Sequence, residues 1–342
     1  GCPWLWTIKC ALNWDHLVEA KHLDVIKWAR QHGAPWGEVE PRDDESDCPW
    51  RRNATCEAAY FGRVETVRWL VTNGCPVSDA VAAAAAAGEQ DVVELLCVEL
   101  GYPLDTQDDD ICCVTASHCH FDLMRWARER GAALEKPVLA LVAQQLDLDD
   151  EIVPEVTETL EWLLYEEGCM PCEDFLGELV SHGDVALSES LLSRLPPGLE
   201  LPWTPEAADR VAFAKDPVAT LKWLEKHGAP VDMNAMARAV YISQVEEFEG
   251  RGLPLLEQFS TQLTGNGIDW RRRRFDYCSW SQATIAEIAV ASSHVPAVQW
   301  LLGQGAEMDV VNAAELARTR IEPGKPFSKG GSEMIAFIEG LV

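Results

Sequence analysis

A recurring twelve-residue pattern constrains the fold of this chain more than any other feature. Each copy has Trp at its seventh position and Gly at its twelfth. The copies in full register are HLDVIKWARQHG (22–33), RVETVRWLVTNG (63–74), HFDLMRWARERG (120–131), PVATLKWLEKHG (217–228) and HVPAVQWLLGQG (294–305). Looser copies end at Gly101, Gly168 and Gly198, the first two with one extra residue before the glycine. Self-similarity with a unit of about 33 residues indicates a repeat protein.

Each copy predicts an amphipathic helix of about ten residues. In the first copy the apolar residues, Trp28 among them, fall at helical spacing and alternate with polar ones. The terminal glycine suits the left-handed conformation that ends a helix, and the proline that often follows cannot continue it. Upstream, DAVAAAAAAG (79–88) predicts a shorter helix of small residues with Asp79 as its capping residue.

Pairs of short antiparallel helices cannot bury their apolar faces alone, so the pairs must stack on one another. The sequence therefore predicts an all-α solenoid of about nine to ten stacked helix pairs with short or degenerate hairpin loops. We expect the repeated Trp to be buried at the same place in every layer. Truncating one of them, such as Trp69, to Ala should then cost about 3–5 kcal/mol.

The repeats can be compared with a known family. HLDVIKWARQHGAPW (22–36) resembles the second helix and following turn of an ankyrin repeat, GHLEVVKLLLEHGADVN, with Trp28 in place of a leucine. The Trp-bearing repeats and Cys48-Pro49-Trp50 are similar to divergent ankyrin arrays of some protists, algae and large viruses. The TPLHxA signature is not intact, and 55–59 and 115–119 are remnants of it. The resemblance implies a non-catalytic scaffold that binds a protein partner through its inter-repeat loops and concave face.

The array is irregular toward its end. We predict ankyrin-like repeats over 1–232, a degenerate repeat with an insertion over 233–280, and an ankyrin-like repeat with a C-terminal cap over 281–342. Within the degenerate repeat, 233–244 and 258–262 have helical patterns, whereas 265–280 does not. This last stretch holds the basic run Arg271–Arg274, flanked by Trp270 and Phe275 as a platform for stacked bases would be.

Charge narrows the choice of partner. The chain has 28 basic and 56 acidic residues, a formal net charge of −28. Such a surface repels nucleic acid and anionic membranes, and it favours a basic protein partner. No apolar run approaches the roughly 18 residues of a membrane span. The 12 cysteines form no regular disulfide framework, so we expect reduced thiols in a cytoplasmic protein. We also expect a monomer with no nucleic-acid or membrane partner.

Chemistry-bearing motifs are few. The sequence holds no GxxxxGK[ST], GxSxG or HExxH motif, so we expect neither an enzyme nor a cofactor. Soft ligands do cluster in one stretch, but without the spaced pairs that zinc favours, and a second stretch has CxxC spacing. These residues are Cys112, Cys113, His118, Cys119 and His120, followed by Cys169 and Cys172. They keep a metal- or redox-linked sensor as an alternative. Another alternative is a substrate-recruiting adaptor segment of a larger protein, since the chain begins at Gly1 rather than Met.

Three turn tryptophans are the candidate partner-binding residues, because they lie beyond the helical stripe and have no evident core role. They are Trp36, Trp50 and Trp203, to which we add the neighbouring Arg51. Aromatic and Arg side chains are the usual anchors of protein interfaces. The alternative is that each Trp covers the edge of the next repeat.

Overall fold

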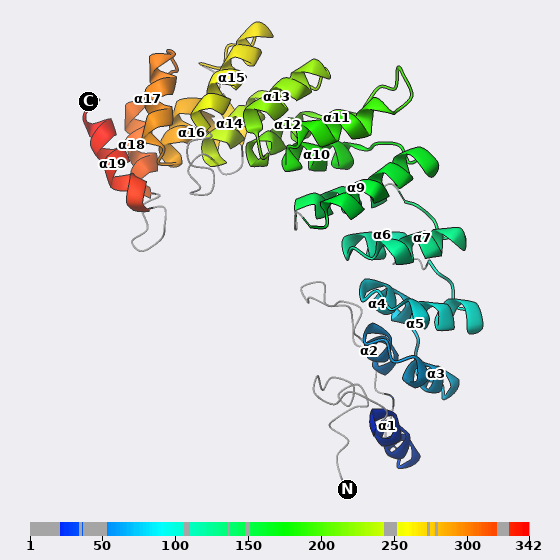
Figure 1. Cartoon of the computed structure of the whole chain (residues 1–342). Helices are drawn as coiled ribbons and strands as arrows, with labels where there is room; N and C mark the ends of the chain where they lie inside the picture. Colours follow the sequence, from blue (N-terminus) through cyan, green and yellow to red (C-terminus); the bar gives the residue numbers. More distant parts are fainter. Residues whose placement is uncertain are drawn as a thin grey trace. The chain divides into compact units, whose positions relative to one another are not determined.

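The computed structural model describes residues 21–33, 36, 53–105, 110–135, 137–147, 151–242, 252–271, 274–277, 280–319 and 328–341. This part of the chain is mostly helical, with one antiparallel pair of strands, so the predicted all-α class is confirmed (Figure 1). The chain forms two compact units, Gly1–Cys169 and Met170–Val342. The predicted boundaries after residues 232 and 280 both lie inside the second unit.

In its described residues, the first unit consists of one helix followed by four helix pairs. The elements are α1 (Lys21–Gln31), α2 (Ala54–Tyr60), α3 (Val64–Thr72), α4 (Ala80–Ala86), α5 (Gln90–Glu94) continued by the π-helical segment η2 (Leu95–Glu99), α6 (Ile111–Ser117), α7 (Phe121–Glu129), α8 (Val138–Gln144) with the 3-10 turn η3 (Gln145–Asp147), and α9 (Val153–Glu161) continued by the π-helical segment η4 (Trp162–Glu166). The first helices of the pairs, α2, α4, α6 and α8, contact one another in sequence. The second helices, α3, α5, α7 and α9, each pack on the first helix of their own pair.

The second unit repeats this arrangement. Its elements are α10 (Glu173–His182), α11 (Val185–Ser193), α12 (Pro205–Asp209) with the 3-10 segment η5 (Arg210–Phe213), α13 (Pro217–Lys226), α14 (Met233–Ile242), α15 (Gly252–Gly265), the strands β1 (Arg274–Tyr277) and β2 (Trp280–Thr284), α16 (Ile285–Ala291), α17 (Val295–Gly303), α18 (Val310–Thr319) and α19 (Ser328–Glu339). The first helices α10, α12, α14, α16 and α18 form one row, and the second helices α11, α13, α15, α17 and α19 form another.

The predicted degenerate repeat forms a full helix pair. Helix α14 contacts the first helices on both sides of it, and α15 contacts α13 and α17. The irregular stretch after α15 contains β1 and β2, which pair antiparallel with a register shift between Phe275 and Asp276. The repeat pattern did not predict this hairpin, because two short strands produce no helical periodicity.

The repeated Trp is not at the centre of the core, which corrects our expectation. Trp28 is 55% exposed, Trp69, Trp126 and Trp300 are partly exposed, and only Trp223, at 4%, is buried. Positions four, five and eight are the buried ones in four of the five copies, as Thr66, Val67 and Leu70, Leu123, Met124 and Ala127, Thr220, Leu221 and Leu224, or Ala297, Val298 and Leu301. In the first copy only position five, Ile26, is buried, and Val25, expected in the buried stripe, is 52% exposed. At 3.6 residues per turn, position seven lies about 100° from the centre of that arc. The Trp therefore lies on the flank of its helix.

The glycine that ends each copy of the twelve-residue pattern has the predicted left-handed backbone. In the first unit Gly74 has φ 77°, and the Cys75 N–H donates to the Leu70 carbonyl at 3.0 Å. This bond returns to position eight and closes the helix end as in a Schellman motif. Ala132, Ala229 and Ala306 donate to Ala127, Leu224 and Leu301 in the same way.

The extra residue of two looser copies is absorbed as a π-helical turn. In η2 the Tyr102 N–H bonds to the Leu96 carbonyl, six residues back rather than five. In η4 the Cys169 N–H bonds to the Leu163 carbonyl with the same spacing. One inserted residue is the ordinary origin of a π-bulge. Both copies therefore keep their buried positions and their terminal glycine.

Candidate partner-binding surface

The turn tryptophans that the structure describes pack against helix tryptophans. The ring centroid of Trp36 lies 5.9 Å from that of Trp69 in the next repeat, and the Arg30 guanidinium carbon lies 4.5 Å from the Trp36 ring. Trp203 lies 5.5 Å from Trp223, edge to face. Both turn tryptophans remain partly exposed. They cover the following repeat, and their role in binding stays a prediction; Trp50 and Arg51 lie outside the described residues.

Trp270 occupies the same kind of position as Trp36. It follows Gly267 by three residues, as Trp36 follows Gly33, and its ring stacks on Trp300 with centroids 6.1 Å apart. Trp270 is fully buried, and the Arg271 guanidinium carbon lies 4.8 Å from the centroid of its ring. A base cannot stack on a buried ring, so Trp270 does not provide the base-stacking platform that its place beside the basic run suggested.

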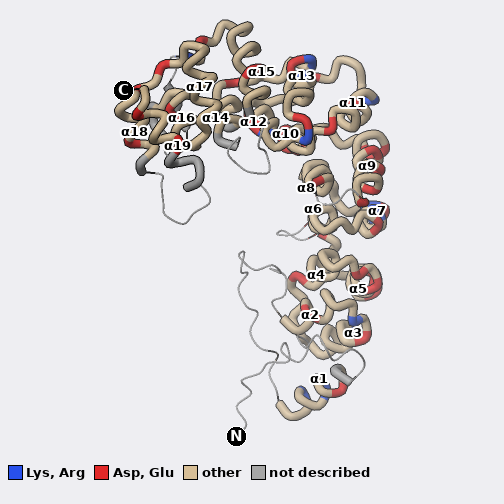
Figure 2. The backbone as a smooth tube through the Cα atoms, turned by 60° about the vertical axis from the view of Figure 1, so that its left-hand side comes forward, with Lys and Arg blue, Asp and Glu red and all other residues tan. Residues whose placement is uncertain are grey.

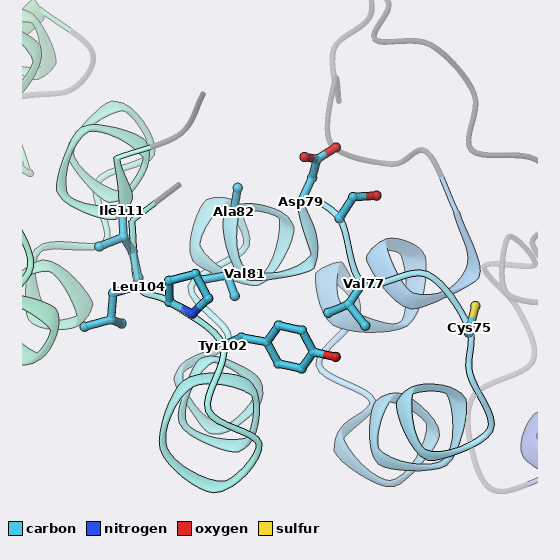
Figure 3. Close-up of a pocket in the computed structure, with 10 residues that line it drawn as sticks. Cys75, Val77, Asp79, Val81, Ala82, Tyr102, Leu104 and Ile111 are labelled. Atoms are coloured by element: carbon cyan, nitrogen blue, oxygen red, sulfur yellow. The ribbon is translucent and has the colours of Figure 1, made fainter. Parts of the chain in front are cut away.

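A pocket of about 420 Å³ opens between the loops of consecutive repeats in the first unit (Figure 3). The loop before α4, the first turns of α4, the loop after η2 and the start of α6 form its walls. Its lining residues are Cys75, Val77, Ser78, Asp79, Val81, Ala82, Tyr102, Pro103, Leu104 and Ile111. In Figure 3 the Tyr102 ring lies between Val77 and Leu104. Sequence reasoning missed these residues, although Val77 and Leu104 each follow a helix-ending glycine by three positions.

Hydrogen bonds between repeats hold the pocket walls in place. On one side the Cys56 thiol donates to the Ser78 carbonyl at 2.8 Å. On the other side Asp105, directly after Leu104, accepts from the Ile111 N–H at 3.2 Å and from the Ala133 N–H of the next repeat at 3.0 Å. Each loop is thus tied to a neighbouring repeat, and the pocket is preformed.

Asp79 has an unusual backbone for its place at the pocket. Its φ is 59°, and its side chain makes no capping hydrogen bond to α4, so the predicted cap is wrong. Asp and Asn tolerate this left-handed region better than most residues with a Cβ. The left-handed turn brings Asp79 into the pocket lining.

Acidic side chains lie in and beside the pocket. Among the lining residues in the described part of the chain, Asp79 alone is an Asp, Glu, Lys, Arg or His. Asp105 and Asp110 flank it in sequence, and the Asp110 carboxylate accepts from the N–H groups of Cys112 and Cys113 at 2.7 and 3.2 Å. Burial raises the pKa of Asp110 despite these bonds. A cation would therefore meet a negative field here.

Two basic residues of the second helices in this unit have close acidic partners in the next layer. Arg68 of α3 pairs with Glu99 of η2 at 2.6 Å, and Arg128 of α7 pairs with Glu167 at 2.8 Å. Acidic residues are frequent along α5 and α9, whereas α7 carries both charges (Figure 2). These ion pairs leave an acidic excess on the first unit.

The cysteines and histidines of the candidate sensor are engaged separately. The Cys119 thiol donates to the Gln145 amide oxygen at 3.3 Å, His118 contacts the Val114 carbonyl, and His120 contacts the Ala86 carbonyl. Burial raises the pKa of Cys112, and it raises the pKa of Cys113 to about 12. Within the described ranges, no three His, Cys, Asp or Glu side chains gather as a metal site requires. Burial also raises the pKa of Cys169, opposite to the shift of reactive thiols.

Comparison with known proteins adds no family. No protein-family model matches the chain, and no curated protein matches it. In the part of the chain that the structure describes, no helix is both long enough and apolar enough to cross a membrane.

Proposed function

We propose that this chain is a non-catalytic, ankyrin-like solenoid that binds a protein partner through the inter-repeat loops of its first unit. The observation that carries the proposal is the pocket formed jointly by the loops before α4 and α6. A concave, mostly apolar site with a few polar groups is the usual form of a binding site. Its position on the loops agrees with the binding mode that the ankyrin resemblance implies.

Several features of the repeats support the ankyrin-like interpretation. The helix pairs stack in rows within each unit, and every described second helix of the five in-register copies ends at a glycine with positive φ. The residue after that glycine, as in Ala132 and Ala229, is buried against its helix. This small residue corresponds to the alanine of the ankyrin turn GADVN.

The lining chemistry favours binding over catalysis. A nucleophile needs a base within hydrogen-bond reach or a lowered pKa. Burial raises the pKa of the Cys75 thiol, and Asp79 is the one carboxylate among the described lining residues. We propose the same non-catalytic role for the whole chain, in a cytoplasmic setting that keeps its thiols reduced.

The test is affinity capture from the native cell with a blocked pocket. Ser78 is exposed at the pocket, so Ser78→Trp covers the opening. The change also removes the 3.4 Å hydrogen bond that Asn53 donates to the Ser78 hydroxyl, so a thermal melt verifies that the variant is folded. Gln90→Trp, at an exposed position on α5 of the same repeat, is the matched control. We expect Gln90→Trp to capture the same partner as the native chain and Ser78→Trp to lose it. Equal capture by both variants would show that the partner binds elsewhere.

A further inference from the structure

We propose that the pocket between the loops before α4 and α6 receives an arginine side chain from a basic segment of the partner. This inference rests on the proposed function, and it names the chemical group that the pocket selects. Three properties of the pocket carry it: apolar walls, an aromatic face and a negative surrounding.

The apolar walls suit the stem of a long cationic side chain. Val77, Val81 and Leu104 line the pocket, and their methyl groups can cover the three methylenes of arginine. A volume of about 420 Å³ accommodates one long side chain together with part of its backbone. The walls are held by hydrogen bonds to the neighbouring repeats, so binding requires little ordering of the loops.

The aromatic face distinguishes arginine from lysine. Tyr102 lies in the middle of the lining in Figure 3, with its ring between Val77 and Leu104. A planar guanidinium stacks on such a ring and loses less hydration than an ammonium group does. An arginine therefore gains contacts with Tyr102 that a lysine gains only in part.

The charge around the pocket has the right sign. Asp79 is in the lining, Asp105 and Asp110 flank it, and none of the lining residues that the structure describes is Lys, Arg or His. Arg68 and Arg128, on the second helices of this unit, are paired with carboxylates of their own next layers. The net charge of −28 also draws a basic segment toward the chain at a distance.

The experiment measures binding of a labelled peptide, (Gly-Ser-Arg) repeated three times, by fluorescence anisotropy on the full chain. The comparison peptide carries citrulline, the neutral isostere of arginine, at the same places, and a third peptide carries lysine. We expect citrulline to weaken binding about tenfold or more, and lysine several-fold. Equal affinities for the arginine and citrulline peptides would overturn the proposal, because the pocket would then not select the positive charge of the guanidinium.

Variants separate the pocket from general attraction to an acidic chain. Asp79→Asn removes one charge while keeping a residue that tolerates positive φ, and Tyr102→Leu removes the aromatic face. Glu94→Gln removes one charge from an exposed position on α5. We expect about fivefold or greater loss for both pocket variants and less than about twofold for Glu94→Gln. Equal losses for Asp79→Asn and Glu94→Gln would show attraction by overall charge alone. Thermal melts followed by circular dichroism verify that each variant is folded.

Failure of this inference is distinguishable from failure of the proposed function. If Ser78→Trp loses the native partner while Asp79→Asn retains it, the loops bind a protein but not through an arginine. If Ser78→Trp retains the partner, the proposed site itself is wrong.

Discussion

The first and second helices of the pairs bury their surfaces in different ways. All seven residues of α4 are buried, including five consecutive alanines, and all seven of α16 are buried as well. Helix α7, in contrast, buries only Phe121, Leu123, Met124 and Ala127. A first helix lies between two other first helices and beneath its own second helix, whereas a second helix keeps one side open. Neighbours on every side restrict the size of each residue on a first helix. The open side of a second helix permits charged residues, large side chains and the π-helical turns that extra residues form.

A first helix can bury even a Glu side chain when the hydrogen bonds of its carboxylate are complete. Glu287 of α16 is fully buried, and its carboxylate accepts from the Thr284 N–H at 2.9 Å and from the Asp309 N–H at 3.0 Å. The Glu287 N–H in turn donates to the Thr284 hydroxyl oxygen, which completes a capping box. Glu287 thus both caps its own helix and holds the start of the next first helix.

The largest expected effect tests whether only second helices absorb an extra residue. Both π-helical segments, η2 and η4, continue second helices. We expect one alanine inserted between Val71 and Thr72 of α3 to form a similar π-helical turn and lower the melting temperature by only a few degrees. The same insertion between Ala84 and Ala85 of α4 rotates buried residues out of the core and should cost about 5 kcal/mol or more. Thermal melts of both variants measure the difference.

The insertion pair has an outcome that contradicts the comparison. If the two insertions lower the melting temperature equally, the open side of the second helix does not explain the π-helical segments. Insertion into α3 that abolishes folding would have the same meaning.

The next prediction concerns the repeated Trp. The unfolding free energy lost when one is truncated to Ala should depend on how deeply that Trp is buried and not on its place in the repeat. Trp223→Ala removes a buried ring and should cost about 3–5 kcal/mol. Trp126 is partly exposed with Arg130 above its ring at 4.1 Å, so Trp126→Ala should cost about 1–2 kcal/mol. Urea unfolding of each variant gives the two values. Equal losses would restore the interpretation that every layer buries its Trp in the same way.

Sequence periodicity predicted the second helices better than any other element. The second helices, their glycine ends and the places of the two extra residues all follow from aligning the copies, because helix spacing and helix termination are local properties. Burial of Trp28 was wrong, since the pattern shows which residues are apolar but not how far the covering helix extends. The Asp79 cap was wrong because a left-handed turn replaced the extended backbone that capping needs.

The pocket could not be predicted in the same way. Val77 and Tyr102 lie in loops of different repeats, and neither loop has a periodic pattern of its own. They meet only because α4 and α6 stack, which is a consequence of the whole array. The repeat pattern therefore predicts the scaffold, whereas the site depends on residues that vary between repeats.

A smaller effect tests the restriction on residue size directly. Ala83 is fully buried in α4, between α2 and α6, so Ala83→Leu forces extra methyl groups into a packed interior. Overpacking of this kind costs about 1–3 kcal/mol. Ala336→Leu makes the same change at an exposed position on the second helix α19, and we expect it to be nearly neutral. Chemical denaturation distinguishes them, and equal losses would mean that leucine itself, not the enclosed site, is responsible.

The smallest expected effect is a pH dependence at the junction between a first and a second helix. His120 begins the second helix of its pair, and its Nε2 contacts the carbonyl of Ala86, at the end of α4, at 3.1 Å. Burial lowers the pKa of His120 below 6.5, assisted by the charge of His118 and opposed by the Ala86 hydrogen bond and Glu89. The unfolded chain therefore binds a proton before the folded chain does, so this contribution to stability is complete above about pH 6.5 and decreases as the pH falls below it. His120→Gln keeps a donor for the carbonyl but does not titrate, so its melting temperature should fall less between pH 7.5 and 6.0 than that of the native chain. An equal decrease in melting temperature in both proteins would assign the pH dependence to other groups. It would also mean that His120 is solvated in the folded chain.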